Sequence, residues 1–266
     1  MLGVSRAGYY DWLDRPESKQ RQRRTVLKAK IDAIHKDSHQ IYGSPRIHGE
    51  LVELGEVVGV NTVARVMREH GIQSKVHHRF VTTTNSRHQN PIAENLLDRD
   101  FTASGPDQKW ASDVTFIPTR SGWLYLATVM DLFSRKIIGW SMGARNSTQL
   151  ICNALQMAID HRQTVRGVLL HSDRGATYAS SDYQDLLRKH EIICSMSRKG
   201  DCWDNAAMES FYHSLKTEWV VFEDYRTHDE AKASLFTYIE LFYNRKRRHS
   251  TLGYLSPATY EERMCA

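Results

Sequence analysis

Three acidic residues in this chain have the types and positions that chemistry on a phosphodiester requires. Asp173 ends the aliphatic run of "VLLHSDRGATY", Asp113 lies in the β-rich segment "KWASDVTFIPT", and Glu209 lies in "DNAAMESFYHSLK", with 35 residues between it and Asp173. Each acid alone also fits an ordinary role, as a strand acid near a turn, a loop cap or a solvated helix residue. Gathered in one pocket, the carboxylates would repel one another unless cations neutralised them. Mg²⁺ prefers such oxygen ligands, and two ions would support in-line displacement at phosphorus.

The elements that must position these acids follow one another after Pro106. β-rich segments predict strands at 112–119, 122–131, 135–142, 167–173 and 192–197, and helical periodicity predicts helices at 148–162, 181–191 and 204–219. This order is that of a ribonuclease-H-like α/β domain, a five-stranded mixed sheet with flanking helices. Because the first and fourth strands are neighbours in that fold, Asp113 and Asp173 are predicted to meet at one end of the sheet.

The predicted helix at 204–219, capped by Asp204, determines where Glu209 points. Its core-facing stripe consists of Met208, Phe211, Tyr212, Leu215 and Trp219. A file of polar residues runs beside that stripe at i, i+4, i+8 and i+11: Asn205, Glu209, His213 and Lys216. If the helix presses its stripe on the sheet, we expect it to hold Glu209 toward the two aspartates.

An all-α region with a helix-turn-helix-like segment is predicted before the sheet. The stretch "YGSPRIHGELVELGEVVGVNTVARVMREHGI" predicts two short helices around a glycine-containing turn, with Asn61 as an N-cap and Gly71 as a C-cap. Arg65 and Arg68 are predicted on the outer face of the second helix, where DNA contacts could form. A plain helical hairpin fits the pattern nearly as well.

The domain organisation follows from these patterns. Residues 1–79 are expected to form the helical DNA-binding region. Residues 80–106 are polar, contain Pro91 and Pro106, and are expected to form a linker. Residues 107–266 are expected to form the catalytic core, ending in a basic arm.

Composition excludes some classes of protein and favours a polyanionic partner. No apolar stretch approaches the roughly 20 residues of a membrane span, and the opening "MLGVSRAGYYDW" has no signal-peptide core, so we expect a cytoplasmic protein. The four cysteines form no CxxC pair, so we expect no structural zinc. Residues 1–90 hold 15 Lys/Arg against 9 Asp/Glu, whereas residues 91–266 hold 21 against 22. The basic front half suits nucleic acid, although solvated helix faces explain it equally well.

A second cluster of positive charge lies near the end of the chain. In "FYNRKRRHSTLGY" four basic residues are consecutive: Arg245, Lys246, Arg247 and Arg248. Such a cluster is typical of binding to the phosphate backbone rather than reading of bases. A solvated run of charge is the alternative.

Several motifs together resemble a known family. "WASDVTFIP", "HSDRGATY" and "DNAAMESFYHSLKTE", with the 35-residue gap, resemble the DDE core of retroviral integrases and bacterial insertion-sequence transposases. The chain is most similar to the second-reading-frame subunit of two-frame insertion sequences, the IS-three group. "LGVSRAGYYDW", "YGSPRIHGEL" and "YNRKRRHSTLGYLSPATYE" also resemble that subunit, so the likeness covers nearly the whole chain.

The resemblance implies an activity and roles for particular residues. It implies that Asp113, Asp173 and Glu209 form a catalytic triad that binds two Mg²⁺ ions, with Mn²⁺ as a substitute. The implied reactions are hydrolysis at the element's end, which frees a 3′-OH, and attack of that hydroxyl on target DNA. Lys216 matches a position that contacts terminal DNA, although an exposed helix lysine is the alternative. Asn205 and Arg174 are expected near the scissile phosphate.

The implied partners are DNA, further copies of the chain and a second subunit. Joining two element ends implies at least a dimer. In this family a first reading frame supplies a helix-turn-helix and a leucine zipper, and this chain shows no heptad zipper, so recognition of the element ends is expected to need that subunit. The expected location is the bacterial cytoplasm, at the nucleoid. Two other functions remain open: another nuclease on the same fold, and a non-catalytic DNA-binding regulator of the element.

Overall fold

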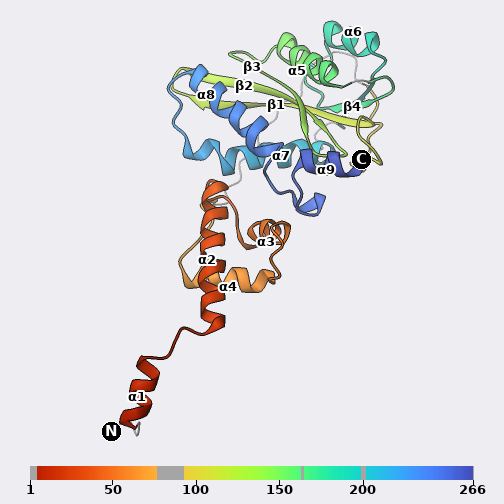
Figure 1. Ribbon diagram of the computed structural model, residues 1–266. Coiled ribbons are helices and arrows are strands. Elements are labelled where there is room, and N and C mark those ends of the chain that lie inside the picture. Colours follow the sequence, from red (N-terminus) through yellow and green to blue (C-terminus); the bar gives the residue numbers. More distant parts are fainter. Residues whose placement is uncertain (1–4, 77–92, 163–164, 199–201, 266) are drawn as a thin grey trace. The chain divides into compact units, whose positions relative to one another are not determined.

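The computed structural model describes residues 5–76, 93–162, 165–198 and 202–265. The chain divides into two compact units, Met1–Lys75 and Val76–Ala266, each of which is described by itself. The first unit is helical and the second contains the sheet (Figure 1). No helix within the described residues is long and apolar enough to cross a membrane.

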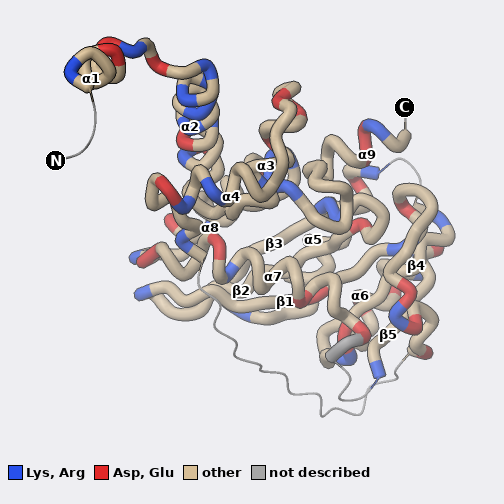
Figure 2. Tube along the Cα trace, turned by 90° about the horizontal axis from the view of Figure 1, so that it is seen from below, with Lys and Arg blue, Asp and Glu red and all other residues tan. Residues whose placement is uncertain are grey.

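The described part of the first unit contains four helices, three of which surround a small apolar core. The four helices are α1 (Arg6–Leu13), α2 (Lys19–Asp37), α3 (Ser44–Glu53) and α4 (Val60–Glu69). The core side chains come from α2, α3 and α4: Ile31, Ile47, Leu51, Val63 and Val66. Lys and Arg are frequent along α2 (Figure 2). The expected N-cap at Asn61 is wrong, because Gly59 is the extended residue before the helix and Asn61 lies within its first turn.

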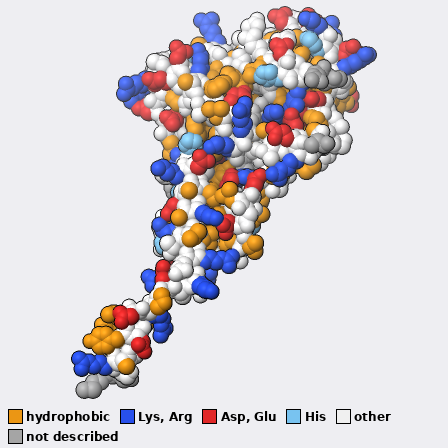
Figure 3. Space-filling view, viewed as in Figure 1, with side chains coloured by type: hydrophobic (Ala, Val, Ile, Leu, Met, Phe, Trp, Pro, Cys, Tyr) orange, Lys and Arg blue, Asp and Glu red, His pale blue; other side chains and the backbone are white. Residues whose placement is uncertain are grey.

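Helix α1 buries none of its side chains within this chain. Its four large apolar residues are all exposed: Tyr9, Tyr10, Trp12 and Leu13. Figure 3 shows hydrophobic side chains gathered on the surface of this N-terminal helix. The helix is held locally, since the Ser5 hydroxyl accepts a hydrogen bond from the Gly8 amide.

The second unit contains the predicted five-stranded mixed sheet. Its strands are β1 (Lys109–Thr119), β2 (Gly122–Asp131), β3 (Ile137–Gly143), β4 (Leu169–Ser172) and β5 (Ile193–Met196). Their order is β3-β2-β1-β4-β5. The β3–β2 and β2–β1 pairs are antiparallel, and the β1–β4 and β4–β5 pairs are parallel. The prediction that the first and fourth strands are neighbours is therefore confirmed.

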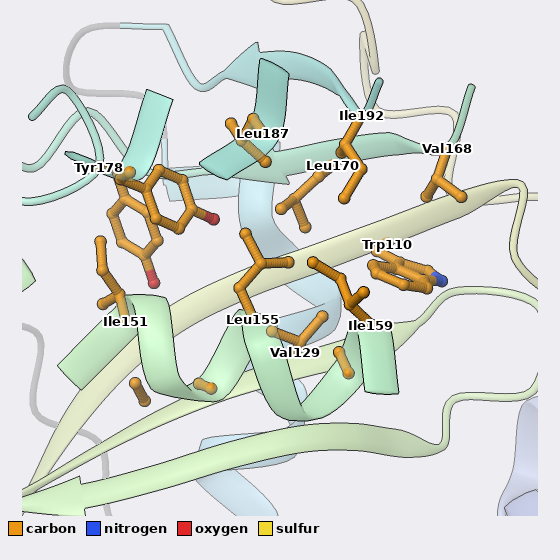
Figure 4. Packing of buried hydrophobic residues seen from close by; sticks show 14 of the residues in the cluster. Trp110, Val129, Ile151, Leu155, Ile159, Val168, Leu170, Tyr178, Leu187 and Ile192 are labelled. Atoms are coloured by element: carbon orange, nitrogen blue, oxygen red, sulfur yellow. The ribbon is translucent and has the colours of Figure 1, made fainter. Parts of the chain in front are cut away.

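Helices cover both faces of this sheet. Helices α5 (Thr148–His161) and α6 (Ser181–Lys189) lie on one face, and α7 (Ala206–Glu218) and α8 (His228–Phe236) lie on the other (Figure 1). On the first face, Leu155 and Ile159 of α5 meet Trp110, Val129 and Leu170 of the strands in one apolar cluster (Figure 4).

Helix α5 approaches β3 so closely that one position tolerates only glycine. A Cβ atom on Gly139 would stand 2.2 Å from the carbonyl oxygen of Ala154. This backbone contact fixes the distance between the helix and the sheet.

The segment expected as a linker is only partly described, and its described part packs on the core. Residues 77–92 lie outside the described residues, and residues 93–106 belong to the second unit. Leu97 is fully buried, and its amide donates to the Ser195 hydroxyl.

Asp204, expected as a helix cap, is a buried acceptor for Asn95, Arg99 and Arg198, and Asn205 precedes α7 in its place. Sequence patterns did not reveal this hub because two of its partners, Asn95 and Arg99, are more than 100 positions away.

The expected C-terminal arm is also packed against the domain. Helix α8 continues into a π-helical stretch at Thr237–Tyr243, and α9 spans Pro257–Cys265. The buried Asn244 side chain pairs with β3, accepting from the Ile137 amide and donating to its carbonyl, both at 2.9 Å. Asn244 thus occupies hydrogen-bonding groups of an edge strand.

Candidate active site

Asp113 lies on β1, and its backbone is tied to α7. The Tyr212 hydroxyl donates to the Asp113 carbonyl at 2.6 Å and lies 2.8 Å from the hydroxyl of Thr128 on β2. Tyr212 was expected as part of the apolar stripe, and its ring is indeed buried. Its hydroxyl contacts both β1 and β2 and so fixes the position of α7 on the sheet. The apolar periodicity of the helix does not predict these hydrogen bonds. The Asp113 carboxylate is half-buried and accepts the Val114 amide at 2.8 Å.

Asp173 follows β4 directly, as predicted. The last parallel pair between β1 and β4 joins Ala111 to His171, so both aspartates stand two residues beyond that pair on neighbouring strands. Asp173 lies just past the end of β4, whereas Asp113, which was expected at one end of the sheet, lies within β1 and stays paired with Thr128 of β2. The Gly175 amide donates to Asp173 Oδ1 at 2.7 Å. This hydrogen bond orients the carboxylate within a tight turn.

The loop that follows Asp173 is anchored by Tyr178. The ring of Tyr178 is fully buried, and its hydroxyl lies 3.0 Å from the Ser112 hydroxyl, beside Asp113. Upstream, His171 is buried between the hydroxyls of Ser195 and Ser197. The loop is therefore fastened at both ends, and neither anchor was singled out by sequence reasoning.

Glu209 lies in α7, one turn before Tyr212 and near the same side of the helix. It is exposed, and partial burial raises the pKa of its carboxyl group. The predicted placement of Glu209 at the edge of the apolar stripe matches this exposure.

Electrostatics links the three acids. Burial, followed by the negative charge of Asp173, raises the pKa of Asp113 well above its ordinary value, and Glu209 adds to the increase. The Val114 hydrogen bond and Lys216 oppose this shift. Asp113 is thus near enough to both other acids to respond to their charges. Among the described residues, no three His, Cys, Asp or Glu side chains stand close enough to enclose a metal ion by themselves.

The donor set nevertheless suits a hard divalent cation. All three groups are carboxylates, and burial and repulsion from the other two acids disfavour the charged form of Asp113. A cation between them would relieve both effects. Oxygen donors are those that Mg²⁺ prefers.

Lys216 points toward this site. Its ammonium group lies 4.9 Å from the centre of the Phe116 ring. Burial lowers the pKa of Lys216, and the charge of Asp113 raises it in part. Lys216 is thus half-buried and close enough to Asp113 to respond to its charge, and its expected contact with terminal DNA stays a prediction.

The two other residues expected near the scissile phosphate are less accessible. Asn205 is 6% exposed, and its Oδ1 atom has no hydrogen-bond partner among the described residues. Arg174 is half-buried, and its Nε donates to the carbonyl of Ser197 at the end of β5.

The basic cluster near the end of the chain does not act as one unit. The prediction that Arg247 binds DNA is wrong: Arg247 is 5% exposed, and its guanidinium donates to both carboxylate oxygens of Glu218 at 2.6 and 2.7 Å. Arg248 is half-buried and donates to the carbonyl of Tyr254.

Arg245 and Lys246 are exposed, and Arg245 lines a cleft of about 480 Å³ with Lys136 and acidic residues of the C-terminal helices. Only Arg245 and Lys246 keep the exposure that phosphate binding requires.

Arg65 and Arg68, in the first unit, are both exposed on α4, as predicted. The apolar side chains Val63, Val66 and Met67 face inward on the same helix. The outer face of α4 thus carries positive charge.

Comparison with known families identifies both units. Residues 21–80 match the model of an HTH-like domain. Residues 103–202 and 190–257 match two models of an integrase core domain.

Two relatives and one solved structure extend this likeness. The chain is 46% identical over 268 residues to transposase InsF for insertion sequence IS3A of Escherichia coli (strain K12), covering 100% of this chain and 93% of that protein. It is 41% identical over 263 residues to the insertion element IS600 uncharacterized 31 kDa protein of Shigella sonnei, covering 99% and 97%. A chain of the simian T-cell lymphotropic virus intasome in complex with PP2A regulatory subunit B56 gamma shares the fold, with a TM-score of 0.51, 16% identity, and coverage of 87% of this chain and 74% of that chain.

Proposed function

Because the chain belongs to the insertion-sequence transposase family that includes InsF of IS3, a DDE polynucleotidyl transferase family with an integrase core, we propose that Asp113, Asp173 and Glu209 are its catalytic acids. The observation that supports this assignment is geometric: Asp113 and Asp173 occupy matching positions on the neighbouring strands β1 and β4, and α7 carries Glu209. Besides burial, the charges of Asp173 and Glu209 raise the pKa of Asp113, which agrees with this arrangement. Perturbed carboxyls that respond to one another are typical of catalytic sites.

The three carboxylates would hold two Mg²⁺ ions, with Mn²⁺ as a substitute. When bound, the ions supply activation of the attacking oxygen and stabilisation of the leaving oxygen at phosphorus. Asp113 would contribute from within β1, Asp173 from the end of the neighbouring β4, and Glu209 from α7. The hydrogen bond from the Tyr212 hydroxyl to the backbone carbonyl of Asp113 keeps α7, and with it Glu209, against β1.

The reaction consists of two displacements at phosphorus. In the first, water attacks the phosphodiester at the element end, the bond to the 3′ oxygen breaks, and a 3′-OH is left. In the second, that hydroxyl attacks a target phosphodiester and displaces another 3′ oxygen. Lys216 would hold a DNA phosphate beside Asp113, with Arg174 and Asn205 near the scissile group.

DNA outside the active site would meet the exposed basic residues. Arg65 and Arg68 on α4 would contact the element end, and Arg245 and Lys246 would contact backbone phosphates. We place the reaction at the bacterial nucleoid, in an assembly of at least two copies joined by a first-frame subunit that recognises the ends.

An end-joining assay tests the proposal. Purified protein is incubated with labelled element-end duplex, target DNA and Mg²⁺ or Mn²⁺, and joined products are measured for the wild type and for Asp173→Asn. Joining by the wild type alone is the expected result. Cleavage of RNA–DNA hybrids without joining would favour another nuclease, and DNA binding with no metal-dependent product in either protein would favour a regulator.

A further inference from the structure

Two aromatic side chains are exposed at the end of the β1–β2 hairpin. Phe116 is 37% exposed and Trp123 is 52% exposed. Their ring centres are 4.9 Å apart and their planes lie at 81°, an edge-to-face pair. Phe116 is also the register partner of Tyr125, which is half-buried. An exposed aromatic pair in contact is a candidate contact surface for a partner.

The pair adjoins the proposed active site through an open strand edge. In the part of the chain that the structure describes, β4 pairs with β1 only over Lys109–Ala111. The edge of β1 beyond Ala111 is therefore left without a strand partner on that side. Lys216 extends from α7 to this edge, where its ammonium group lies 4.9 Å from the Phe116 ring centre and interacts with Asp113.

We propose that Phe116 and Trp123 form a stacking platform for an unpaired base of the DNA whose phosphate is held at Asp113. This inference rests on the proposed function. Two residues of β1 lie between Asp113 and Phe116, so their Cα atoms are about 10 Å apart, and the alternation of a strand directs the two side chains to opposite faces, so that the DNA would pass around the open edge of β1. That distance suits a base one or two nucleotides from the scissile phosphate, with Lys216 between the two sites to contact the intervening phosphate.

The chemistry of the platform matches a nucleotide better than an apolar partner. A base presents a flat π-face to an aromatic ring and carries an anionic phosphate on its backbone. The platform offers two aromatic rings and one ammonium group. Arg145, exposed in the loop after β3, adds positive charge near Gly143, the register partner of Tyr125.

A base-by-residue scan tests the platform. Element-end duplexes carrying a single abasic site at successive positions around the cleavage point are joined by the wild type, Trp123→Ala and Trp123→Phe. Phe222→Ala, an exposed aromatic outside the hairpin, is the matched control. The same duplexes are used to measure equilibrium binding.

The expected result is one position whose abasic substitution slows wild-type joining about tenfold. Trp123→Ala should join intact ends about tenfold more slowly and lose its sensitivity at that position, whereas Trp123→Phe and Phe222→Ala should retain it. If no position depends on Trp123 in either joining or binding, the platform is excluded.

Two outcomes separate this inference from its neighbours. A change in the sedimentation of DNA-free protein on Trp123→Ala would make the patch a subunit contact and overturn the proposal. If the wild type joins no ends, the proposed function fails, and the binding scan still decides whether Trp123 stacks on a base.

Discussion

Asp113 and Asp173 each lie two residues beyond Ala111 and His171, the last parallel pair that joins β1 to β4. The two acids therefore lie at matching positions on neighbouring strands, where the pairing of β1 with β4 stops while β1 stays paired with β2 up to Thr119. There the charge of Asp173 raises the pKa of Asp113. The end of pairing also opens the β1 edge that Lys216 reaches.

Removing the charge of Asp113 should stabilise the metal-free protein while abolishing joining. Asp113→Asn keeps an oxygen that accepts the Val114 amide but removes the repulsion from the other acids. We expect a gain of about 1 kcal/mol, or about 2–4 °C in melting temperature, in the presence of EDTA. Mg²⁺ should raise the melting temperature of the wild type but not that of Asp113→Asn. Asp160→Asn, an exposed acid on α5, is the control, and a lower melting temperature for Asp113→Asn would contradict the repulsion.

Gly175 should matter for metal binding rather than for folding. A Cβ atom at this position would stand 2.9 Å from Asp173 Oδ1, so Gly175→Ala must displace the carboxylate. We expect the Mg²⁺ concentration for half-maximal joining to rise about tenfold, the usual range for a group that orients a ligand, with little change in melting temperature. Gly59→Ala, where a Cβ meets open space, is the matched control. An unchanged Mg²⁺ dependence would count against a positioning role.

Arg247 should be a stability residue rather than a DNA contact. Its loss removes two hydrogen bonds and the opposite charge from the buried Glu218 carboxylate. Arg247→Ala is expected to lower the free energy of unfolding by about 3–5 kcal/mol, measured by denaturant titration. The neighbouring exposed Lys246→Ala should leave stability unchanged and weaken DNA binding at low salt. Equal effects of the two variants on stability would refute the distinction.

Acid should loosen the attachment of α9 through Glu261. Burial raises the pKa of this carboxyl, but hydrogen bonds from Arg162 and Ser134 outweigh burial and leave the pKa below its ordinary 4.5. Its contribution to stability is therefore complete above about pH 4.5 and is lost as the pH falls through the lower folded value. Asp131 acts in the opposite direction, because burial raises its pKa to about 6 and its charged form is disfavoured in the fold.

Comparing Glu261→Gln with the wild type isolates the contribution of Glu261. The free energy of unfolding is measured from pH 7 to pH 3 for both proteins. The difference between them should be largest at neutral pH and shrink below pH 4.5. A constant difference over this range would show that the charge of Glu261 is not involved.

Local patterns in the sequence were enough to predict the fold of the core and the placement of its acids. Alternation and helical periodicity are set by each segment's own burial, so β1 to β5, α5, α6 and α7 were predicted with small errors at their ends. Asp173 at a strand end and Glu209 beside an apolar stripe follow from the same local geometry. The sequence by itself thus determined the elements, their order and the acids that they carry.

Only the tertiary structure decided which polar groups are buried and paired with other groups inside the molecule. Arg247 looks like its basic neighbours in the sequence, but Glu218, 29 positions away, removes it from the surface. Asp204 looks like a helix cap but binds residues about 100 positions away. Periodicity reports on neighbours within one or two turns, whereas burial of a charge depends on which distant segment folds against it. For the same reason Lys216, on a helix, and Phe116, on a strand, could be recognised as neighbours only once the open edge of β1 was seen.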